Sequence, residues 1–164
     1  MKVHGMTVDP FTNSPIVVLK DLNNEKAVPI WIGLVEASAI AMELEHMNLP
    51  RPMTHDLLKN VIDKMGGKVT RVEVCDIKDN TFYGLVHIEK DGHVMEIDSR
   101  PSDAIALALR AEAPIFVAEH VIEKSRYIKT EEGGEPAGDE EKKKKELLEM
   151  LENMDPDDFG KYKM

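Results

Sequence analysis

Apolar residues, mostly Val and Ile, gather in three short segments of the first third of the chain. The segments span residues 2–9, 15–20 and 26–32, and turn residues lie between them, a pattern typical of β-strands. The pattern changes after Gly33, because apolar positions then recur at helical spacing up to about Met47. The first third of the chain is therefore expected to form three strands followed by a helix.

A second helix and a second group of strands are expected in the middle of the chain. Thr54 belongs to the residue types that cap helix N-termini, and the pair Gly66-Gly67 is suited to a helix end. Strands are expected over residues 69–77, 81–89 and 93–98. The pair Asp91-Gly92 before the last strand is a strong hairpin signal. The middle of the chain therefore predicts a helix followed by hairpin-connected strands.

The most apolar stretch of the chain begins after Pro101, a residue type favoured at helix starts. Residues 104–109 are apolar on nearly every side, so this helix is expected to be buried. Pro114 ends it, and a short strand at 115–117 and a helix near 118–127 follow. These elements predict an α+β fold, in which a mixed, mainly antiparallel sheet packs with two to three helices.

The composition changes near residue 130. Residues 131–139 are rich in Gly and Glu, which is typical of a linker. In residues 140–164, four lysines precede apolar residues at helical spacing, which predicts an amphipathic C-terminal helix that packs on its own domain or on a sister subunit. One domain over 1–130, a linker and a charged helical tail are therefore expected.

The charge distribution limits the partners that the chain can bind. The 164 residues include 21 Lys and Arg and 31 Asp and Glu, a net charge of −10. Residues 1–130 carry 15 and 19 of these, a net of −4, so most of the excess acidity lies in residues 131–164. Neither part has the broad basic surface of a nonspecific nucleic-acid binder, and only 5% of residues are aromatic, few for base stacking.

Other features of the composition indicate where the protein works. Cys75 is the single cysteine, so no internal disulfide is possible. No run of 18 apolar residues and no signal-peptide pattern occurs, which predicts a cytoplasmic protein. The chain contains no glutamine and is rich in Glu and Lys, a bias of hyperthermophile proteins. A thermophilic source is expected, with chance depletion in a short chain as the alternative.

Polar residues cluster at the expected junctions where a strand or loop leads into a helix. Side chains at such junctions lie beside the positive end of a helix dipole, where anions bind. The candidate site residues are Glu36, Arg51, His55, Asp56, Asp98, Arg100, Ser102 and Asp103. The sequence motifs of phosphate-binding loops, serine hydrolases and zinc proteases do not occur in the chain.

Each candidate has a chemical and a structural interpretation. Asp98 and Asp103 can together hold Mg²⁺ or Mn²⁺ for phosphodiester cleavage, or Asp103 can simply favour the start of a helix. His55, next to Asp56, offers an imidazole for proton transfer or is an ordinary first-turn histidine. Arg100 can bind phosphate or pair with Asp103.

The remaining candidates have the same two interpretations. Arg51 precedes a proline in a rigid loop and can contact phosphate. Glu36 and Ser102 can bind substrate, or they can complement the dipole and cap a helix, respectively. The other histidines show no zinc-ligand spacing.

Three segments of the chain resemble a known family when they are taken together. They read Pro-x-Trp-Ile-Gly-x-x-Glu-Ala at 29–37, Arg-Pro-x-Thr-His-Asp-Leu-Leu at 51–58, and Asp-Ser-Arg-Pro-Ser-Asp-Ala-Ile-Ala-Leu-Ala at 98–108. In this order and spacing they resemble the bifunctional nuclease domain, formerly a domain of unknown function, over roughly residues 1–130. The resemblance implies a compact α+β fold and association into homodimers or larger homo-oligomers. It also implies hydrolysis of RNA and DNA, an activity assigned to a few members, notably from plants.

Three hypotheses follow for the function. In the first, the protein is a metal-assisted nuclease (DNase and RNase), in which Asp98 and Asp103 hold the ion, His55 moves protons, and Arg51 and Arg100 hold phosphate. In the second, it is a non-catalytic oligomeric module that binds a small anion or a protein partner. In the third, the matched residues only cap helices and build a subunit interface. The first hypothesis requires that the matched segments meet in space.

Overall fold

The computed structural model of the protein describes residues 1–131 with the exception of residues 24 and 48. The strands are β1 (Lys2–Val8), β2 (Pro15–Lys20), β3 (Ala27–Trp31), β4 (Lys68–Lys78), β5 (Thr81–Lys90), β6 (His93–Ser99) and β7 (Ile115–Val117). The helices are α1 (Leu34–Leu44), α2 (Thr54–Lys64), α3 (Pro101–Ala111) and α4 (Glu119–Glu131). The predicted tail helix over 140–164, and the predicted linker beyond its first residue, lie outside the described residues. Within the described residues, no helix is long and apolar enough to cross a membrane.

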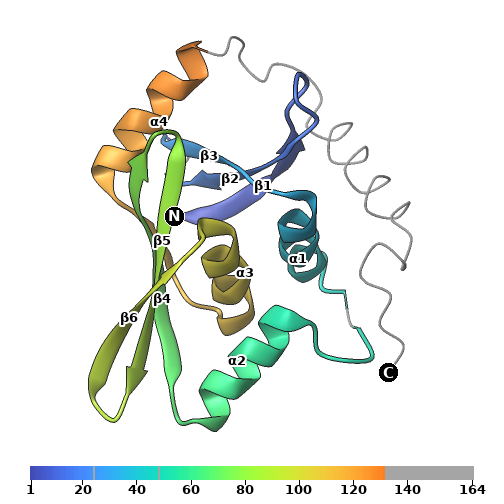
Figure 1. Ribbon diagram of the computed structural model, residues 1–164, viewed down its shortest axis with the longest axis vertical. Coiled ribbons are helices and arrows are strands. Elements are labelled where there is room, and N and C mark those ends of the chain that lie inside the picture. Colours follow the sequence, from blue (N-terminus) through green and yellow to red (C-terminus); the bar gives the residue numbers. More distant parts are fainter. Residues whose placement is uncertain (24, 48, 132–164) are drawn as a thin grey trace.

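The strands divide between two sheets (Figure 1). A three-stranded antiparallel sheet has the order β1-β2-β3, and a four-stranded sheet has the order β6-β5-β4-β7. In the second sheet β4 pairs antiparallel with β5 and parallel with β7. The predicted α+β class with mainly antiparallel strands is therefore confirmed. The strands form two sheets and not the single sheet that was expected.

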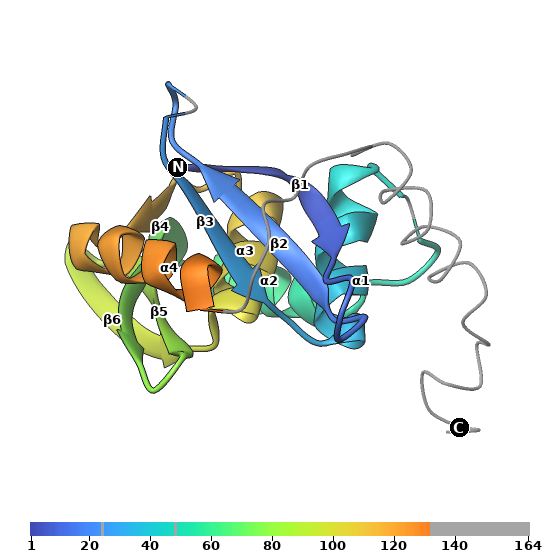
Figure 2. The same ribbon diagram turned by 90° about the horizontal axis from the view of Figure 1, so that it is seen from above.

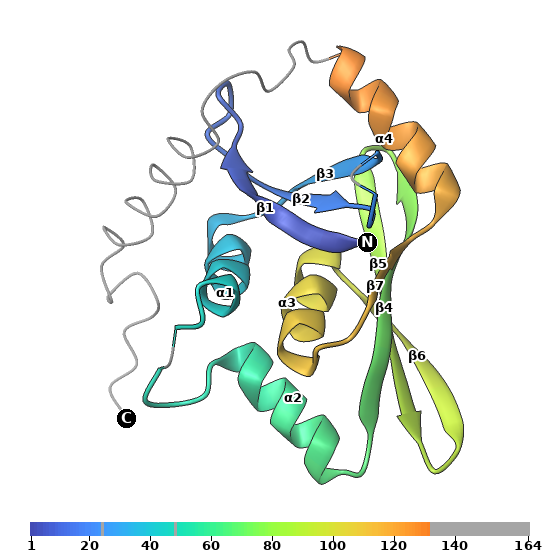
Figure 3. The same cartoon turned by 180° about the vertical axis from the view of Figure 1, so that it is seen from behind.

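Helix α3 lies at the centre of the fold. It packs between the four-stranded sheet on one side and α1 and α2 on the other (Figures 1 and 3). Each of its residues 104–108 is at most 2% exposed. Apolar residues of both sheets join this helix in one core. The prediction of a buried helix is confirmed, and everything at its N-terminus is held in place by this packing.

Helix α4 packs on β4 and β3 and so connects the two sheets (Figure 2). Its residues Val121 and Ile122 are buried in the common core. The region between the two sheets is therefore bounded by regular elements, and it is here that the cavity described below opens.

Gly84 in β5 allows the start of α3 to approach the sheet. A Cβ atom built on Gly84 would lie 3.1 Å from the carbonyl oxygen of Ser99 and 3.2 Å from the Cα and N of Pro101. These neighbours are backbone atoms, so a side chain at this position would push the helix start outward. Gly84 therefore fixes where Arg100 and Asp103 emerge from the fold.

The apolar face of α2 is mostly uncovered. Ile62 is the only residue of this helix that is buried. Leu57, Leu58, Val61 and Met65 are each between 44% and 63% exposed. These four side chains recur at helical spacing and so form one apolar surface, which no described element covers.

Candidate functional site

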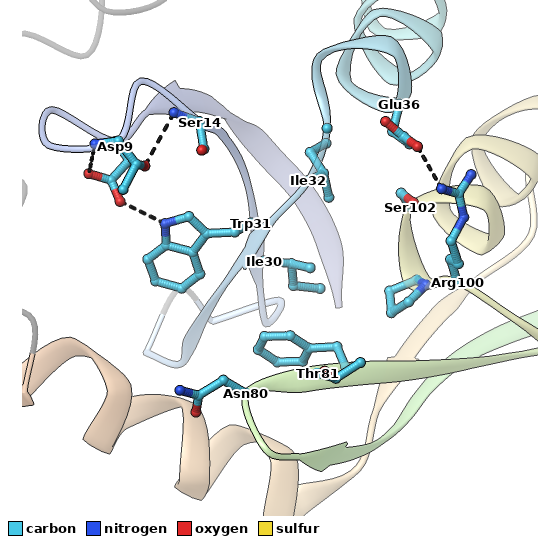
Figure 4. A pocket seen from close by; sticks show the side chains of 14 residues that line it. Asp9, Ser14, Ile30, Trp31, Ile32, Glu36, Asn80, Thr81, Arg100 and Ser102 are labelled. Carbon is cyan, nitrogen blue, oxygen red and sulfur yellow. Dashed lines mark hydrogen bonds and ion pairs between the residues drawn. The ribbon is translucent and has the colours of Figure 1, made fainter.

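Three helices begin close together at the site. Glu36 lies in the first turn of α1, His55 in the first turn of α2, and Arg100 is the N-cap of α3 with Asp103 in its first turn. Hydrogen bonds join these three helix starts, and Figure 4 shows Glu36 and Arg100 pointing toward each other. The structure thus brings together one or more candidates from each of the three matched segments, which we call the polar cluster: Glu36, His55, Arg100 and Asp103.

The guanidinium of Arg100 is the centre of the polar cluster. Its Nε and Nη2 donate to the two carboxylate oxygens of Asp103 at 2.7 and 3.2 Å, and its Nη1 donates to Oε1 of Glu36 at 2.6 Å. The hydrogen bonds to Asp103 and then to Glu36 raise the pKa of Arg100 above its already high value. The side chain is nonetheless 65% exposed, so this charge is accessible from solvent.

His55 and Asp103 form a second pair in the cluster. Nε2 of His55 lies 3.1 Å from Oδ1 of Asp103, and the His55 side chain is 15% exposed. Partial burial opposes the ionisation of Asp103, but the hydrogen bonds from Arg100 and His55 outweigh it, so the pKa of Asp103 is lowered. An ionised carboxylate therefore orients the imidazole, whose Nδ1 bonds to no described group.

Gly33, the N-cap of α1, leaves the space that the Glu36 side chain occupies. A Cβ atom built on Gly33 would overlap the carboxylate of Glu36. Any larger residue would therefore displace Glu36, and with it the bond to Arg100. The glycine of the first matched segment thus has a local structural role.

Asp56 braces the helices behind the cluster. Its carboxylate accepts hydrogen bonds from the backbone N–H of Met53, at 2.8 Å, and from Nε of Arg110. Burial acts against ionisation of Asp56, but these two hydrogen bonds outweigh it and lower its pKa. Met53 is the N-cap of α2, so the expectation that Thr54 caps this helix is wrong by one residue.

The sequence pattern does not single out Arg110, because an arginine at the end of a helix is ordinarily a partner of the helix dipole. Its side chain is only 7% exposed and reaches from α3 to α2. It also donates to the carbonyl oxygens of Ala39 at 3.0 Å and Ala106 at 2.9 Å. Arg110 therefore ties α1, α2 and α3 together beneath the polar cluster.

Asp98 lies apart from the polar cluster. Ile97 is opposite the buried Val86 in the β5–β6 ladder, whereas Asp98 is opposite Leu85. Successive residues of a strand point to opposite faces, so Asp98 points away from the face that α3 covers. The structure does not bring it to Asp103. No group of three or more His, Cys, Asp or Glu in the part of the chain that the structure describes is arranged to hold a metal ion.

Two further candidates lie at the edges of the site. Arg51 is exposed in the segment between α1 and α2 and is outside the network of bonds described above. Ser102 is 6% exposed, in the first turn of α3, and lines a cavity beside Arg100. Ser102 is therefore placed to contact a ligand near the cluster, and Arg51 is not directly connected to it.

The cavity has a volume of about 560 Å³ and opens beside the cluster (Figure 4). It is lined by Asp9, Thr12, Ser14, Ile30, Trp31, Ile32, Gly33, Glu36, Asn80, Thr81, Phe82, Arg100, Pro101 and Ser102. Trp31 belongs to a matched segment, but its place in a cavity depends on Asp9, which bonds to it from 22 residues away. A single sequence gives no signal for such a pair.

Comparison with known proteins agrees with the sequence resemblance. The sequence model of the family described as "Bifunctional nuclease domain" matches residues 17–130, which include the whole polar cluster. A Mycobacterium tuberculosis protein (strain H37Rv), described as uncharacterized, is 34% identical over 161 residues, which cover 97% of this chain and 96% of the mycobacterial one.

Plant relatives match over a smaller share of their length. Bifunctional nuclease 1 of Arabidopsis thaliana is 28% identical over 121 residues, 71% of this chain and 37% of the plant protein. Bifunctional nuclease 1 of Oryza sativa subsp. indica is 26% identical over 112 residues, 66% and 34% of the two chains. The match thus spans about a third of each plant protein. The family match covers most of the chain, so the protein belongs to the bifunctional nuclease domain family.

Proposed function

We propose that the protein is a nuclease that hydrolyses phosphodiester bonds of RNA and DNA at the polar cluster. The observation that carries the proposal is the meeting of three helix N-termini around one exposed guanidinium and one carboxylate-oriented imidazole. Helix N-termini and an arginine attract phosphate, and an oriented imidazole can move a proton. The names of the plant relatives support the same class of reaction.

His55 is the proton-transfer group of the proposed reaction. Because Asp103 is ionised, it accepts the hydrogen on Nε2 and leaves Nδ1 as the free acceptor. Nδ1 takes a proton from the attacking water, and the water oxygen bonds to phosphorus as the bond between phosphorus and the leaving oxygen breaks. The imidazolium then gives the proton to the leaving oxygen. A group in this role contributes about 10²- to 10⁴-fold to the rate.

Arg100 is the phosphate-binding group. A guanidinium has five N–H donors, and three of those of Arg100 are used by Asp103 and Glu36. The remaining two can hold a phosphate oxygen while the carboxylates keep the side chain fixed. A fixed positive charge of this kind stabilises the negative charge that develops in the transition state.

The role of Mg²⁺ or Mn²⁺ is a separate question. Asp98 and Asp103 do not fit one ion, because they point to opposite sides of the four-stranded sheet. The two carboxylates that lie together are Glu36 and Asp103, and Arg100 already bonds to both. In the proposed reaction His55 and Arg100 act through their own side chains, and the cleavage assay tests metal dependence directly.

A cleavage assay on RNA, single-stranded DNA and duplex DNA tests the proposal. Wild type is compared with His55→Ala in Mg²⁺, in Mn²⁺ and in EDTA, at moderate and elevated temperature. Cleavage that falls about 10²- to 10⁴-fold in the variant supports the proposal. His87→Ala is the matched control, because His87 lies on the outer face of the sheet and is expected to retain activity. Absence of cleavage by wild type, or equal cleavage by wild type and His55→Ala, contradicts it.

We also propose that the protein associates with copies of itself through the apolar surface of α2. The four exposed side chains on this helix favour that role, since contiguous exposed apolar patches mark interaction sites. Val61→Glu is expected to dissociate the oligomer in light scattering, whereas the exposed Glu89→Gln is not. A wild-type monomer contradicts the proposal of self-association.

An oligomer that binds an anion or a protein partner at Arg100 without cleaving it is the second candidate function.

A further inference from the structure

The cavity beside the polar cluster is lined by both apolar and polar residues. The apolar wall consists of Ile30, Trp31, Ile32, Phe82 and Pro101. Its volume of about 560 Å³ is within the ~300–1,000 Å³ typical of small-ligand sites. In Figure 4, Trp31 and Ile30 lie on one side of this space, and Arg100 lies across it. Two of the wall residues are aromatic, although the whole chain has few aromatic residues.

The indole of Trp31 is held in a fixed orientation. Its Nε1 donates to Oδ2 of Asp9 at 2.8 Å, and Oδ1 of Asp9 accepts the backbone N–H of Phe11 at 2.9 Å. These hydrogen bonds, that from Trp31 first, lower the pKa of Asp9. Asp9 is only 8% exposed, so its charge is satisfied within the fold and is not offered to a ligand. The hydrogen bond to Asp9 thus fixes the indole ring as part of the cavity wall.

The polar lining of the cavity includes the exposed guanidinium of Arg100 and the carboxylate of Glu36 that is bonded to it. Arg100 retains two N–H donors that point to no described acceptor, and Ser102 lies next to it. Asn80 and Thr81, at the β4–β5 turn, add amide and hydroxyl groups to the rim. A ligand that matches this distribution has a flat apolar face, polar edges and an anionic group at one end.

We propose that the cavity binds one unstacked base of a single-stranded RNA or DNA, with the base against Trp31 and its backbone phosphate at Arg100. This inference rests on the proposed nuclease function and extends it from the bond that is cleaved to the way in which the strand is held. Every nucleobase has a π face, so stacking of this kind tolerates all sequences, as a nuclease that acts on both RNA and DNA requires. Duplexes are disfavoured, because a paired base must first leave its stack.

The fluorescence of the protein tests the inference directly. Trp31 is the only tryptophan in the 164 residues, so emission excited selectively from tryptophan reports on this cavity alone. The full-length protein is titrated in EDTA with an oligothymidylate hexamer that has phosphorothioate linkages. A second hexamer with the same linkages but abasic sugars is the matched probe. The base-containing hexamer is expected to quench the emission and to bind about 5- to 150-fold more tightly than the abasic one.

Variants locate the contribution of the ring. Trp31→Leu is expected to weaken binding of the labelled hexamer, measured by anisotropy, about 5- to 150-fold. Trp31→Phe keeps an aromatic face and is expected to recover most of the affinity. This second variant keeps the inference testable if the leucine variant fails to fold. Phe116→Leu removes an aromatic ring that is 49% exposed elsewhere on the surface, and it is expected to bind as wild type does.

Equal binding of the two hexamers, or full affinity in both Trp31 variants, overturns the inference. The cleavage assay separates this failure from failure of the proposed function. Cleavage that depends on His55 without base-dependent binding leaves the nuclease proposal standing and removes the base subsite. Base-dependent quenching without any cleavage supports the base subsite and removes the nuclease proposal.

Discussion

Asp103 beside His55 and the glutamates beside His87 lie on opposite sides of the four-stranded sheet and are held differently. On the helix-covered side, the carboxylates of Asp56 and Asp103 are bonded to guanidinium groups at 2.5 to 3.2 Å. On the outer side, Glu73 and Glu96 each lie 3.6 Å from a ring nitrogen of His87, too far for a hydrogen bond. His87 is only 2% exposed, and both its nitrogens lack a hydrogen-bond partner among the described residues. His55 on the helix-covered side is therefore hydrogen-bonded to a carboxylate that an arginine also binds, whereas His87 on the outer side is not hydrogen-bonded to the glutamates near it.

Asp98 and Asp103 show how the difference arises within one short segment. The segment passes from β6 into α3. The direction of the Asp98 side chain follows from the alternation of side chains between the two faces of a strand, and that of Asp103 follows from its position in the first turn of the helix. Five residues of separation thus place the two carboxylates on different sides of the sheet. The comparison predicts that changes on the helix side have large effects and that equal changes on the outer side have small ones.

The largest effect on stability is expected from Arg110→Ala. The change removes the hydrogen bonds that Arg110 donates to Asp56 and to the carbonyl oxygens of Ala39 and Ala106. We expect a loss of about 2–3 kcal/mol in the free energy of unfolding, less than the ~3–5 of a fully buried pair because Asp56 is partly exposed. Denaturant unfolding measures it. The exposed Arg71→Ala, on the outer side, is the control and is expected to change stability by no more than about 0.5 kcal/mol. Equal losses in the two variants would contradict the comparison.

Gly84→Ala is expected to have the next largest effect. The added methyl group would contact backbone atoms of Ser99 and Pro101 at 3.1 to 3.2 Å, which forces the start of α3 outward. We expect a loss of about 1–2 kcal/mol and reduced cleavage, because Arg100 moves with the helix. Gly5→Ala is the matched control, since a Cβ at Gly5 has no neighbour within 4 Å. An unchanged melting temperature for Gly84→Ala would show that the close approach is not needed.

The pH dependence of the free energy of unfolding should reveal the contribution of Asp103 on the helix-covered side. The pKa of Asp103 is lower in the folded protein than its ordinary value of about 3.9, so the folded state favours the ionised form. Its contribution is therefore present above about pH 4 and is lost as the pH falls through the lowered folded pKa. Asp103→Asn is expected to lose less stability than wild type over this window in denaturant titrations. Parallel loss in both proteins would contradict the assigned pKa direction.

The smallest effect is expected from His87→Leu on the outer side. The imidazole is buried without hydrogen bonds, so its replacement by an apolar side chain removes a desolvated polar group. We expect the free energy of unfolding to stay within about 1 kcal/mol of wild type or to rise, and cleavage to be retained. A loss above about 2 kcal/mol in thermal unfolding would mean that Glu73 and Glu96 hold His87 more strongly than their 3.6 Å separations indicate.

The regular elements were predictable because their signals are local. The apolar run at 104–109 predicted a buried helix, and Asp91-Gly92 predicted a hairpin; both residues of the pair have positive φ, as such a turn requires. The division into two sheets and the exposure of α2 were not predictable, because they depend on which elements pack on which.

The site was predictable only in part, because some of its contacts also depend on which elements pack on which. The matched segments pointed to Arg100, Asp103 and His55, which do meet. Arg110 bonds to a residue 54 positions away, and a pair at that distance leaves no mark on a single sequence. Asp98 resembled a metal ligand because it is close to Asp103 in the chain. In the fold, however, it lies on the face of β6 that points away from α3.

The most direct test of the central claim is to compare RNA cleavage by Asp103→Asn and Asp98→Asn under identical conditions. Both variants make the same chemical change in the same segment, one inside the polar cluster and one outside it. We expect Asp103→Asn to lower the cleavage rate about 10²- to 10⁴-fold, because the amide no longer orients His55 and Arg100, and Asp98→Asn to cleave as wild type does. Equal loss in both variants, or loss in Asp98→Asn alone, would contradict the account.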